Sequence, residues 1–279
     1  MYQSNKNTIL IKTYLTASYW NGKIPELLKQ RFTDYLEITN NHVGFKDADD
    51  FIKYLGWSID KNAVTTFPEM DVTPLVVQTI RDSLDICLKT IPNEINQIFV
   101  YPTQNAFVKE SMNGVSGFTP TNNILILFVV LDNDFATALE ETVVHEFNHS
   151  IFWRHTKWNR LIDGFVGEGL AEHFREDLVG GKSAPWSLKN NLEECKKWFH
   201  ILDEKGYIYE ETSKLPVGIY GDVFTNPKSE YPHWIGYSIG YQMVKAFCEK
   251  NPDMSWSEIM KLRVEDISSE FLKAIGLYT

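Results

Sequence analysis

Residues 141–152 read ETVVHEFNHSIF and contain the pattern His-Glu-x-x-His. If this stretch is helical, His145 and His149 lie one turn apart on the same face. Their Cβ atoms are then about 5–6 Å apart, so that two imidazoles can share one tetrahedral metal ion. Glu146 lies beside them, where a carboxylate can take a proton from a metal-activated water and pass it to a leaving amine. The stretch therefore predicts a zinc site with Glu146 as the general base.

The residues around the pattern favour the helix on which this prediction depends. Apolar side chains recur there at helical spacing, at Phe135, Leu139, Val143, Phe147 and Ile151. Residues 132–134 read DND and offer helix caps just after an apolar run. We therefore expect one long helix to carry the histidines.

A catalytic zinc needs a third protein ligand and an open fourth position. Residues 166–174 read VGEGLAEHF, and the eighteen residues 150–167 separate His149 from Glu168. This His-Glu-x-x-His…Glu-Gly-x-Ala arrangement resembles the gluzincin metallopeptidases, especially the aminopeptidase N-like and thermolysin-like groups. The resemblance implies Zn²⁺ held by His145, His149 and Glu168. Glu172, one turn further on, could accept a hydrogen bond from the distal nitrogen of a ligating histidine.

The chain is also similar to the YjaZ-like family of predicted bacterial zinc-dependent proteases. The similarity lies in EGLAEHF at 168–174, GVSGFTP at 114–120 and PHWIGYSIGY at 232–241, and it covers roughly residues 95–250. It implies a zincin-like fold and a peptide or protein substrate. Residues 1–90 add little to this recognition.

Gluzincins commonly donate to the oxyanion of the tetrahedral intermediate from a Tyr or His of the C-terminal lobe. Tyr237 is our first choice for this donor, with Tyr241 and His233 as alternatives on the same expected helix. Both tyrosines have the competing interpretation of ordinary amphipathic core residues.

In gluzincins the strand that borders the cleft pairs with the substrate backbone. Residues 117–119 are the candidate for such an edge, with Gly117 as a possible substrate contact. An ordinary buried sheet is the alternative.

The length and composition suit a chain with a substantial core. A chain of 279 residues with 43% hydrophobic content can form one large or two modest domains. We expect an N-terminal helical scaffold at 1–94 and a zincin-like catalytic region at 95–279, joined in one two-lobed unit. The fold class should be α+β and mainly helical, with a small sheet in the N-terminal lobe and a helical C-terminal lobe.

The net charge and the lengths of the apolar runs argue against certain classes of binding partner. The net charge of −10 argues against nucleic acid or an anionic membrane as the main partner. The most apolar run, residues 124–131, is too short to span a membrane. Cys87, Cys195 and Cys248 lie far apart in the sequence, so we expect buried free thiols rather than a disulfide. No export signal is visible near the N-terminus, and we therefore expect a cytoplasmic location. The sequence leaves the oligomeric state open.

Periodicity and turn residues also predict the other elements. Strands are expected at 9–14, 95–101 and 124–131, with a Gly/Pro turn region at 114–123. Helices are expected at 24–36, at 49–55, from the N-cap Thr73 to residue 91, at 161–178, from the cap Ser187 to residue 202, from Tyr231-Pro232 to residue 250, and at 255–263 and 268–275, with a loop at 207–230.

Together these patterns predict zinc-dependent hydrolysis of peptide bonds. One alternative is a zinc-dependent hydrolase of a non-peptide amide or ester. The other is a binding or regulatory protein that holds zinc without catalysis. The presence of Glu146 argues against the second alternative, since a structural zinc site needs no general base.

Overall fold

The computed structural model describes residues 2–4, 7–16, 47, 49, 71–131, 135–181 and 184–277. The chain divides into two compact units, Met1–Ser150 and Ile151–Thr279. The helices expected at 24–36 and 49–55, and the caps expected at 132–134, lie outside the described residues. The division expected after residue 94 stays a prediction. As expected, the fold is α+β and mainly helical with a small sheet.

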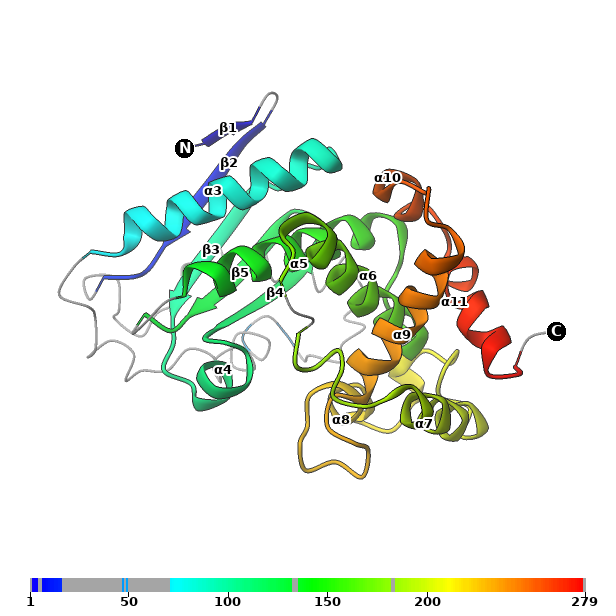
Figure 1. Ribbon diagram of the computed structural model, residues 1–279. Helices are drawn as coiled ribbons and strands as arrows, with labels where there is room; N and C mark the ends of the chain where they lie inside the picture. The colour runs from blue at the N-terminus through cyan, green and yellow to red at the C-terminus, as the bar shows by residue number, and fades with distance from the viewer. Residues whose placement is uncertain are drawn as a thin grey trace. The chain divides into compact units, whose positions relative to one another are not determined.

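The first unit holds a five-stranded sheet in the order β1-β2-β3-β5-β4 (Figure 1). The strands β2, β3 and β5 run parallel, whereas the outer strands β1 and β4 run antiparallel to their neighbours. Their bounds are β1 Tyr2–Ser4, β2 Asn7–Thr13, β3 Gln97–Pro102, β4 Val115–Thr121 and β5 Ile124–Val129. The three predicted strands are therefore confirmed. The continuous apolar runs of β3 and β5 suit inner strands that are buried on both faces.

The strand β4 corrects the turn region expected at 114–123. Its register with β5 is regular from Val115 to Phe118 and shifts between Phe118 and Thr121. Pro120 falls within this irregular part, where an edge strand tolerates a residue without a backbone N–H. The turn-like composition thus belongs to β4, which is the last of the described strands in the sheet order, and residues 117–119 lie on that edge of the described sheet.

Two helices of the first unit precede the histidine segment. The helix α3, Thr73–Thr90, begins at a Val72 N-cap and not at the expected cap Thr73, whose backbone N–H is instead bound by Asp71 at 2.9 Å. Its buried residues are Val76, Ile80, Ser83, Leu84 and Cys87. The helix α4, Ala106–Ser111, is a helix beyond those predicted, and the Asn105 side chain caps it.

The helix α5, Ala136–His155, confirms the long helix predicted around the histidines. All five apolar residues of the predicted stripe are buried. Figure 1 shows α3 and α5 on the same side of the sheet. The Asn93 side chain, just after α3, donates to the Ser150 hydroxyl at 2.6 Å, and this hydroxyl donates to the Phe147 carbonyl, also at 2.6 Å. The position of α5 within its unit is therefore fixed by polar as well as apolar contacts.

The second unit is helical and is built around the pair α6, Leu161–Val179, and α9, Ile235–Lys250. These helices touch backbone to backbone, because Gly169 of α6 faces Gly240 of α9. A Cβ at Gly169 would overlap the Gly240 carbonyl oxygen and lie 2.6 Å from its carbonyl carbon. The glycines of α6 thus weaken the isolated helix but permit this close packing.

The helices α7, α8 and α11 pack against α9, whereas Trp256 of α10 contacts Phe174 and Asp177 of α6 (Figure 1). Their bounds are α7 Leu192–Glu204, α8 Ile219–Phe224, α10 Trp256–Ile259 and α11 Val264–Ala274, with a 3₁₀ turn η3 at Thr212–Lys214. The predicted cap Ser187 is wrong, since Asn191 forms the capping box of α7 with Glu194. The loop expected at 207–230 contains η3 and α8.

The helix α9 begins later than the sequence predicts. Trp234, with a positive φ of 63°, is its N-cap, so Tyr231, Pro232 and His233 precede the helix. Its predicted end at Asn251 is confirmed. The last helix, α11, starts four residues before the predicted position because Arg263 caps it with Asp266. These shifts move His233 off the helix that carries the two tyrosines.

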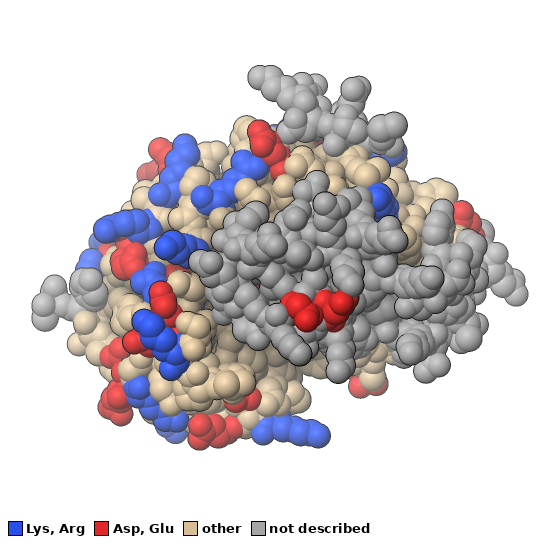
Figure 2. Space-filling model, turned by 180° about the vertical axis from the view of Figure 1, so that it is seen from behind, with Lys and Arg blue, Asp and Glu red and all other residues tan. Residues whose placement is uncertain are grey.

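Surface charges of the two signs lie close together. On the face that Figure 2 shows, the described Lys and Arg side chains lie among Asp and Glu side chains. No described helix combines the length and the apolar composition that crossing a membrane requires. The three cysteines are free thiols, of which Cys87 and Cys195 are buried and Cys248 is half-buried. Burial raises the pKa of Cys248 to about 11, which makes it an unreactive thiol at neutral pH.

Candidate metal centre

The helix α5 brings its two histidines together, as the spacing predicts. The ring centroids of His145 and His149 are 4.5 Å apart, and the rings meet edge to face at 89°. His149 is 5% exposed, and His145 is half-buried. The opposite face of α5 is anchored by the buried stripe, so this face presents both imidazoles in one place.

Glu146 is 5% exposed and lies against the edge strand β4. The Thr119 hydroxyl donates to Glu146 Oε2 at 2.6 Å and lies 3.1 Å from the Glu146 backbone oxygen. Gly117 gives the same side chain its space, because a Cβ there would lie 2.5 Å from Oε1 and 2.6 Å from Cδ. The carboxylate beside the histidines is therefore held by two residues of β4.

Glu168 lies on α6 and is 8% exposed. The ligand atoms of His145, His149 and Glu168 all lie within 4.8 Å of one another, and among the described residues this is the group of side chains that could hold a metal ion. Two ligand atoms on a tetrahedral zinc, at about 2.0–2.1 Å from it, lie about 3.4 Å apart. Both the spacing and the set of two imidazoles and one carboxylate therefore fit zinc.

Glu172 is 1% exposed and belongs to a buried polar network. Its Oε1 accepts a hydrogen bond from the Trp186 indole at 2.8 Å, and its Oε2 is paired with Arg175 Nε at 3.2 Å. Arg175, itself 3% exposed, also donates to the Gly180 carbonyl and contacts Glu176 at 3.4 Å. The carboxylate is thus oriented from its own unit. Its expected hydrogen bond to a ligating histidine stays a prediction.

The candidate oxyanion donors have different surroundings. The Tyr241 hydroxyl donates to Glu176 at 3.1 Å, and its ring stacks on His173 at 4.3 Å. The Tyr237 ring lies edge-on to Trp186, at 6.4 Å, and to Phe224 at 5.5 Å. The Tyr241 phenol is therefore bound to a carboxylate of its own unit.

His233 is stacked on Trp234 at 4.0 Å, and its carbonyl accepts a hydrogen bond from the Asn190 side chain. Burial, and secondarily the charge of Lys189, lowers the pKa of His233 below its ordinary value, so that its ring is neutral at pH 7. His233 thus precedes α9, and its ring packs on that of Trp234.

Three contacts were not predicted from the sequence: that of Thr119, expected only as part of the substrate edge 117–119, with Glu146, and those of Arg175 and Trp186 with Glu172. Thr119 lies two positions after Gly117 in a strand, so alternation would have placed both on one face if the strand had been recognised. Arg175 follows Glu172 at helical spacing, which is a signal for an ion pair. Nothing in the sequence signals Trp186, because fourteen residues and a chain reversal separate it from Glu172.

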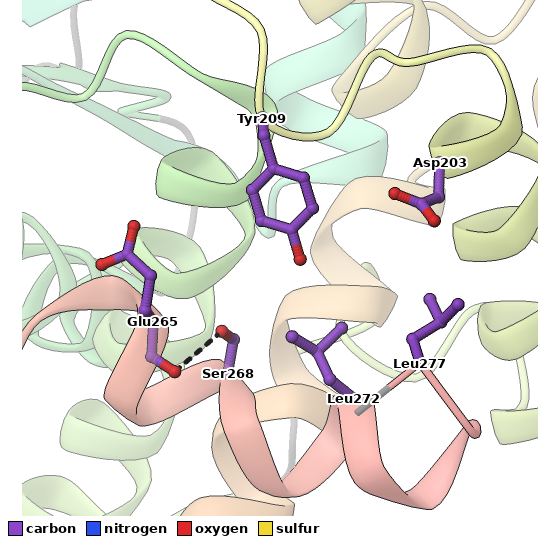
Figure 3. Close-up of a pocket in the computed structure, with 6 residues that line it drawn as sticks. All are labelled: Asp203, Tyr209, Glu265, Ser268, Leu272 and Leu277. Atoms are coloured by element: carbon purple, nitrogen blue, oxygen red, sulfur yellow. Dashed lines mark hydrogen bonds between the residues drawn. The ribbon is translucent and has the colours of Figure 1, made fainter. Parts of the chain in front are cut away.

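A pocket in the second unit lies apart from these residues (Figure 3). Tyr209 and Asp203 border it on one side, and Ser268 and Leu272 of α11 on the other. Its second carboxylate, Glu265, pairs with Arg160 at 2.9 Å, and the Ser268 hydroxyl bonds the Glu265 carbonyl within the helix. Glu265 and Ser268 are therefore both engaged in contacts within their own unit.

Comparison with known proteins gives one family. No curated protein and no solved structure matches the sequence significantly. A family model described as "Predicted Zn-dependent protease (DUF2268)" matches residues 76–269, which include α5, α6 and α9. This match covers more than half of the chain and includes all three possible metal ligands. The chain therefore belongs to the family of predicted zinc-dependent proteases.

Proposed function

We propose that the protein is a zinc-dependent peptidase of the gluzincin type. The observation that carries the proposal is the grouping of two imidazoles and a carboxylate within 4.8 Å, on residues that include both histidines of His-Glu-x-x-His. The family description supports hydrolysis of peptide bonds over the other chemistries of a zinc site. The zincin-like fold and the likeness to the YjaZ-like proteases are part of this proposal.

In the proposed site, His145, His149 and Glu168 hold the zinc ion. Bound there, zinc lowers the pKa of a water and polarises the carbonyl of the scissile bond. Two neutral imidazoles and one carboxylate leave one positive charge on the site, which favours a developing oxyanion. Glu172 lies one turn after Glu168 on α6, and in the proposal it orients a ligating histidine.

Glu146 is the proposed general base. It follows His145 directly on α5, and its carboxylate is buried against β4, away from bulk water. A carboxylate in this position accepts a proton from the attacking water and delivers it to the leaving amine. Exclusion of bulk water lowers the local dielectric constant and so strengthens the electrostatic interactions that assist both proton transfers.

Tyr237 is the proposed oxyanion donor. Tyr241 is less suited, because its hydroxyl is already directed to Glu176. His233 could donate only through a ring that is stacked on Trp234. We propose these two residues as neighbours of the substrate and not as the principal donor.

The proposed substrate is a peptide or a protein segment. The strand β4 is at the edge of the sheet formed by the described strands, and its residues Gly117 and Thr119 contact the proposed base. An extended peptide that added itself to this edge would place its backbone beside Glu146. The sequence tolerance of such pairing suits a peptidase better than a hydrolase of small esters.

Metal analysis and peptide profiling test this function together. The purified protein should bind about one equivalent of zinc, and His149→Ala should lose tight binding, because two ligands do not hold a catalytic zinc. His155→Ala is the matched control, since His155 is exposed at the end of the same helix.

A peptide library should reveal cleavage that Glu146→Gln abolishes while zinc content and unfolding temperature stay unchanged. Full zinc occupancy in His149→Ala would refute the ligand set. Cleavage of esters but not of peptides by the zinc-loaded protein would replace the proposed substrate class.

A further inference from the structure

One face of β4 receives the side chain of Glu146. Gly117 and Thr119 are two residues apart on this strand, so their side-chain positions lie on the same face. Thr119 is 5% exposed, and its hydroxyl is 2.6 Å from Glu146 Oε2. Gly117 faces Cγ, Cδ and Oε1 of the same glutamate. The two residues together therefore enclose one carboxylate.

The two carboxylate oxygens have different surroundings. At 2.6 Å the Thr119–Oε2 contact has the length of a hydrogen bond from a hydroxyl to an ionised carboxylate. This bond occupies Oε2 and fixes the rotation of the carboxylate about its last torsion. Oε1 lies over the position where Gly117 has no side chain. It is therefore the oxygen that stays available for a proton.

We propose that Thr119 and Gly117 are positioning residues for Glu146: the hydroxyl holds Oε2, and the missing Cβ leaves room for Oε1 to face the attacking water. This inference rests on the proposed function, in which Glu146 is the base. It assigns to β4 a second task besides any pairing with substrate, namely the alignment of the base. A misplacement of about 1 Å at such a group can cost about 10²-fold in rate.

Replacement of the hydroxyl tests the first contact. Thr119→Val keeps the branched shape and removes the donor, so kcat should fall about 10–100-fold while KM and zinc content stay within twofold. Thr119→Ser restores the donor and should recover kcat to within about fivefold of wild type. Ser116→Ala, three residues before Thr119 and on the other face of β4, is the matched control and should be near wild type.

Addition of a methyl group tests the second contact. In Gly117→Ala the new Cβ would lie 2.6 Å from Glu146 Cδ, so the carboxylate must move. We expect kcat to fall at least tenfold with zinc content unchanged. A crystal structure of this variant should show Glu146 displaced from its contact with Thr119.

A double-mutant cycle in the metal-free protein provides a measurement that does not depend on activity. Thr119→Val should lower the unfolding temperature of the wild type but change it little in a Glu146→Ala background, because the contact is then already lost. Equal shifts in the two backgrounds would overturn the proposal.

The positioning role is also overturned if the cycle shows coupling but Thr119→Val keeps full kcat, since the bond would then be structural only. Failure of the proposed function is a separate result. It would be seen as a wild-type protein that is inactive on peptides, or as activity retained in Glu146→Gln.

Discussion

Replacement of Arg175 tests how the second unit compensates the charge of the buried Glu172 carboxylate. In Arg175→Met the side chain keeps much of its length and its apolar stem but loses the guanidinium. The pair that is broken joins two side chains that are only 3% and 1% exposed, with Nε 3.2 Å from Glu172 Oε2. The variant also loses the bond to the Gly180 carbonyl and the contact with Glu176. Glu172 is then a buried carboxylate without its compensating charge.

The size of the effect follows from this burial. Breaking a buried pair by removing one partner costs about 3–5 kcal/mol, because the remaining charge is uncompensated. Trp186 still donates to Glu172 Oε1 at 2.8 Å, so we expect the lower end, about 3 kcal/mol. At about 2–4 °C per kcal/mol, the unfolding temperature should fall by about 6–12 °C. A surface pair such as Lys196–Glu193, 2.9 Å apart and with the glutamate side chain 81% exposed, should contribute less than about 1 kcal/mol.

Chemical denaturation of four proteins measures this: wild type, Arg175→Met, Glu172→Gln and the double variant. The amide in Glu172→Gln keeps the shape and removes the buried charge, so the double variant should lose about 1–3 kcal/mol less than the sum of the single losses. Lys196→Met is the surface control. The reasoning fails if Arg175→Met changes the free energy of unfolding by less than 1 kcal/mol, or if the two single effects simply add.

Three further predictions concern α6 and α9. Tyr237→Phe should lower kcat about 10²–10³-fold with KM and zinc content unchanged, whereas Tyr241→Phe should mainly lower the unfolding temperature; full kcat in the first variant would exclude it as the donor. Gly169→Ala should destabilise the protein by about 1–3 kcal/mol because its Cβ meets backbone, whereas Gly221→Ala on α8, where the new Cβ meets only the Thr225 hydroxyl at 4.0 Å, should be neutral or stabilising; equal unfolding temperatures for the two variants would contradict this. Burial lowers the pKa of His173 below its ordinary 6.5, so the unfolded chain takes up a proton that the folded chain does not as pH falls through 6.5. The free energy of unfolding should therefore decrease below pH 6.5, and titration of His173→Gln should show a shallower decrease.

The parts of the fold that could be predicted are those with strong local patterns. The helix α5 could be predicted from the apolar periodicity around the two histidines, and α6, predicted at 161–178, ends within one residue of that position. The strands β3 and β5 were found from their continuous apolar runs. For the candidate site, the three side chains that could hold a metal ion, His145, His149 and Glu168, were all named from the sequence motifs. Their roles as ligands remain part of the proposal.

The elements that were missed depend on contacts between distant segments. The strand β4 reads as a turn because Gly117 and Pro120 suit a turn, and only the sheet edge explains their presence in a strand. Trp234 precedes α9 with a positive φ that no local rule assigns to tryptophan. The bond from Thr119 to Glu146 joins residues 27 positions apart and exists only because β4 and α5 pack together. Local rules cannot supply such tertiary contacts.

The glycine contact between α6 and α9 has a consequence for protein engineering. Since the two backbones touch at Gly169 and Gly240, sliding one helix by a single residue would drive a side chain into the opposite main chain. The close approach of the two backbones therefore fixes the register of the pair. A chimera that takes α6 from a relative must take the matching α9 as well. Exchanging either helix alone separates Glu168 from the helix partner that holds its backbone in place.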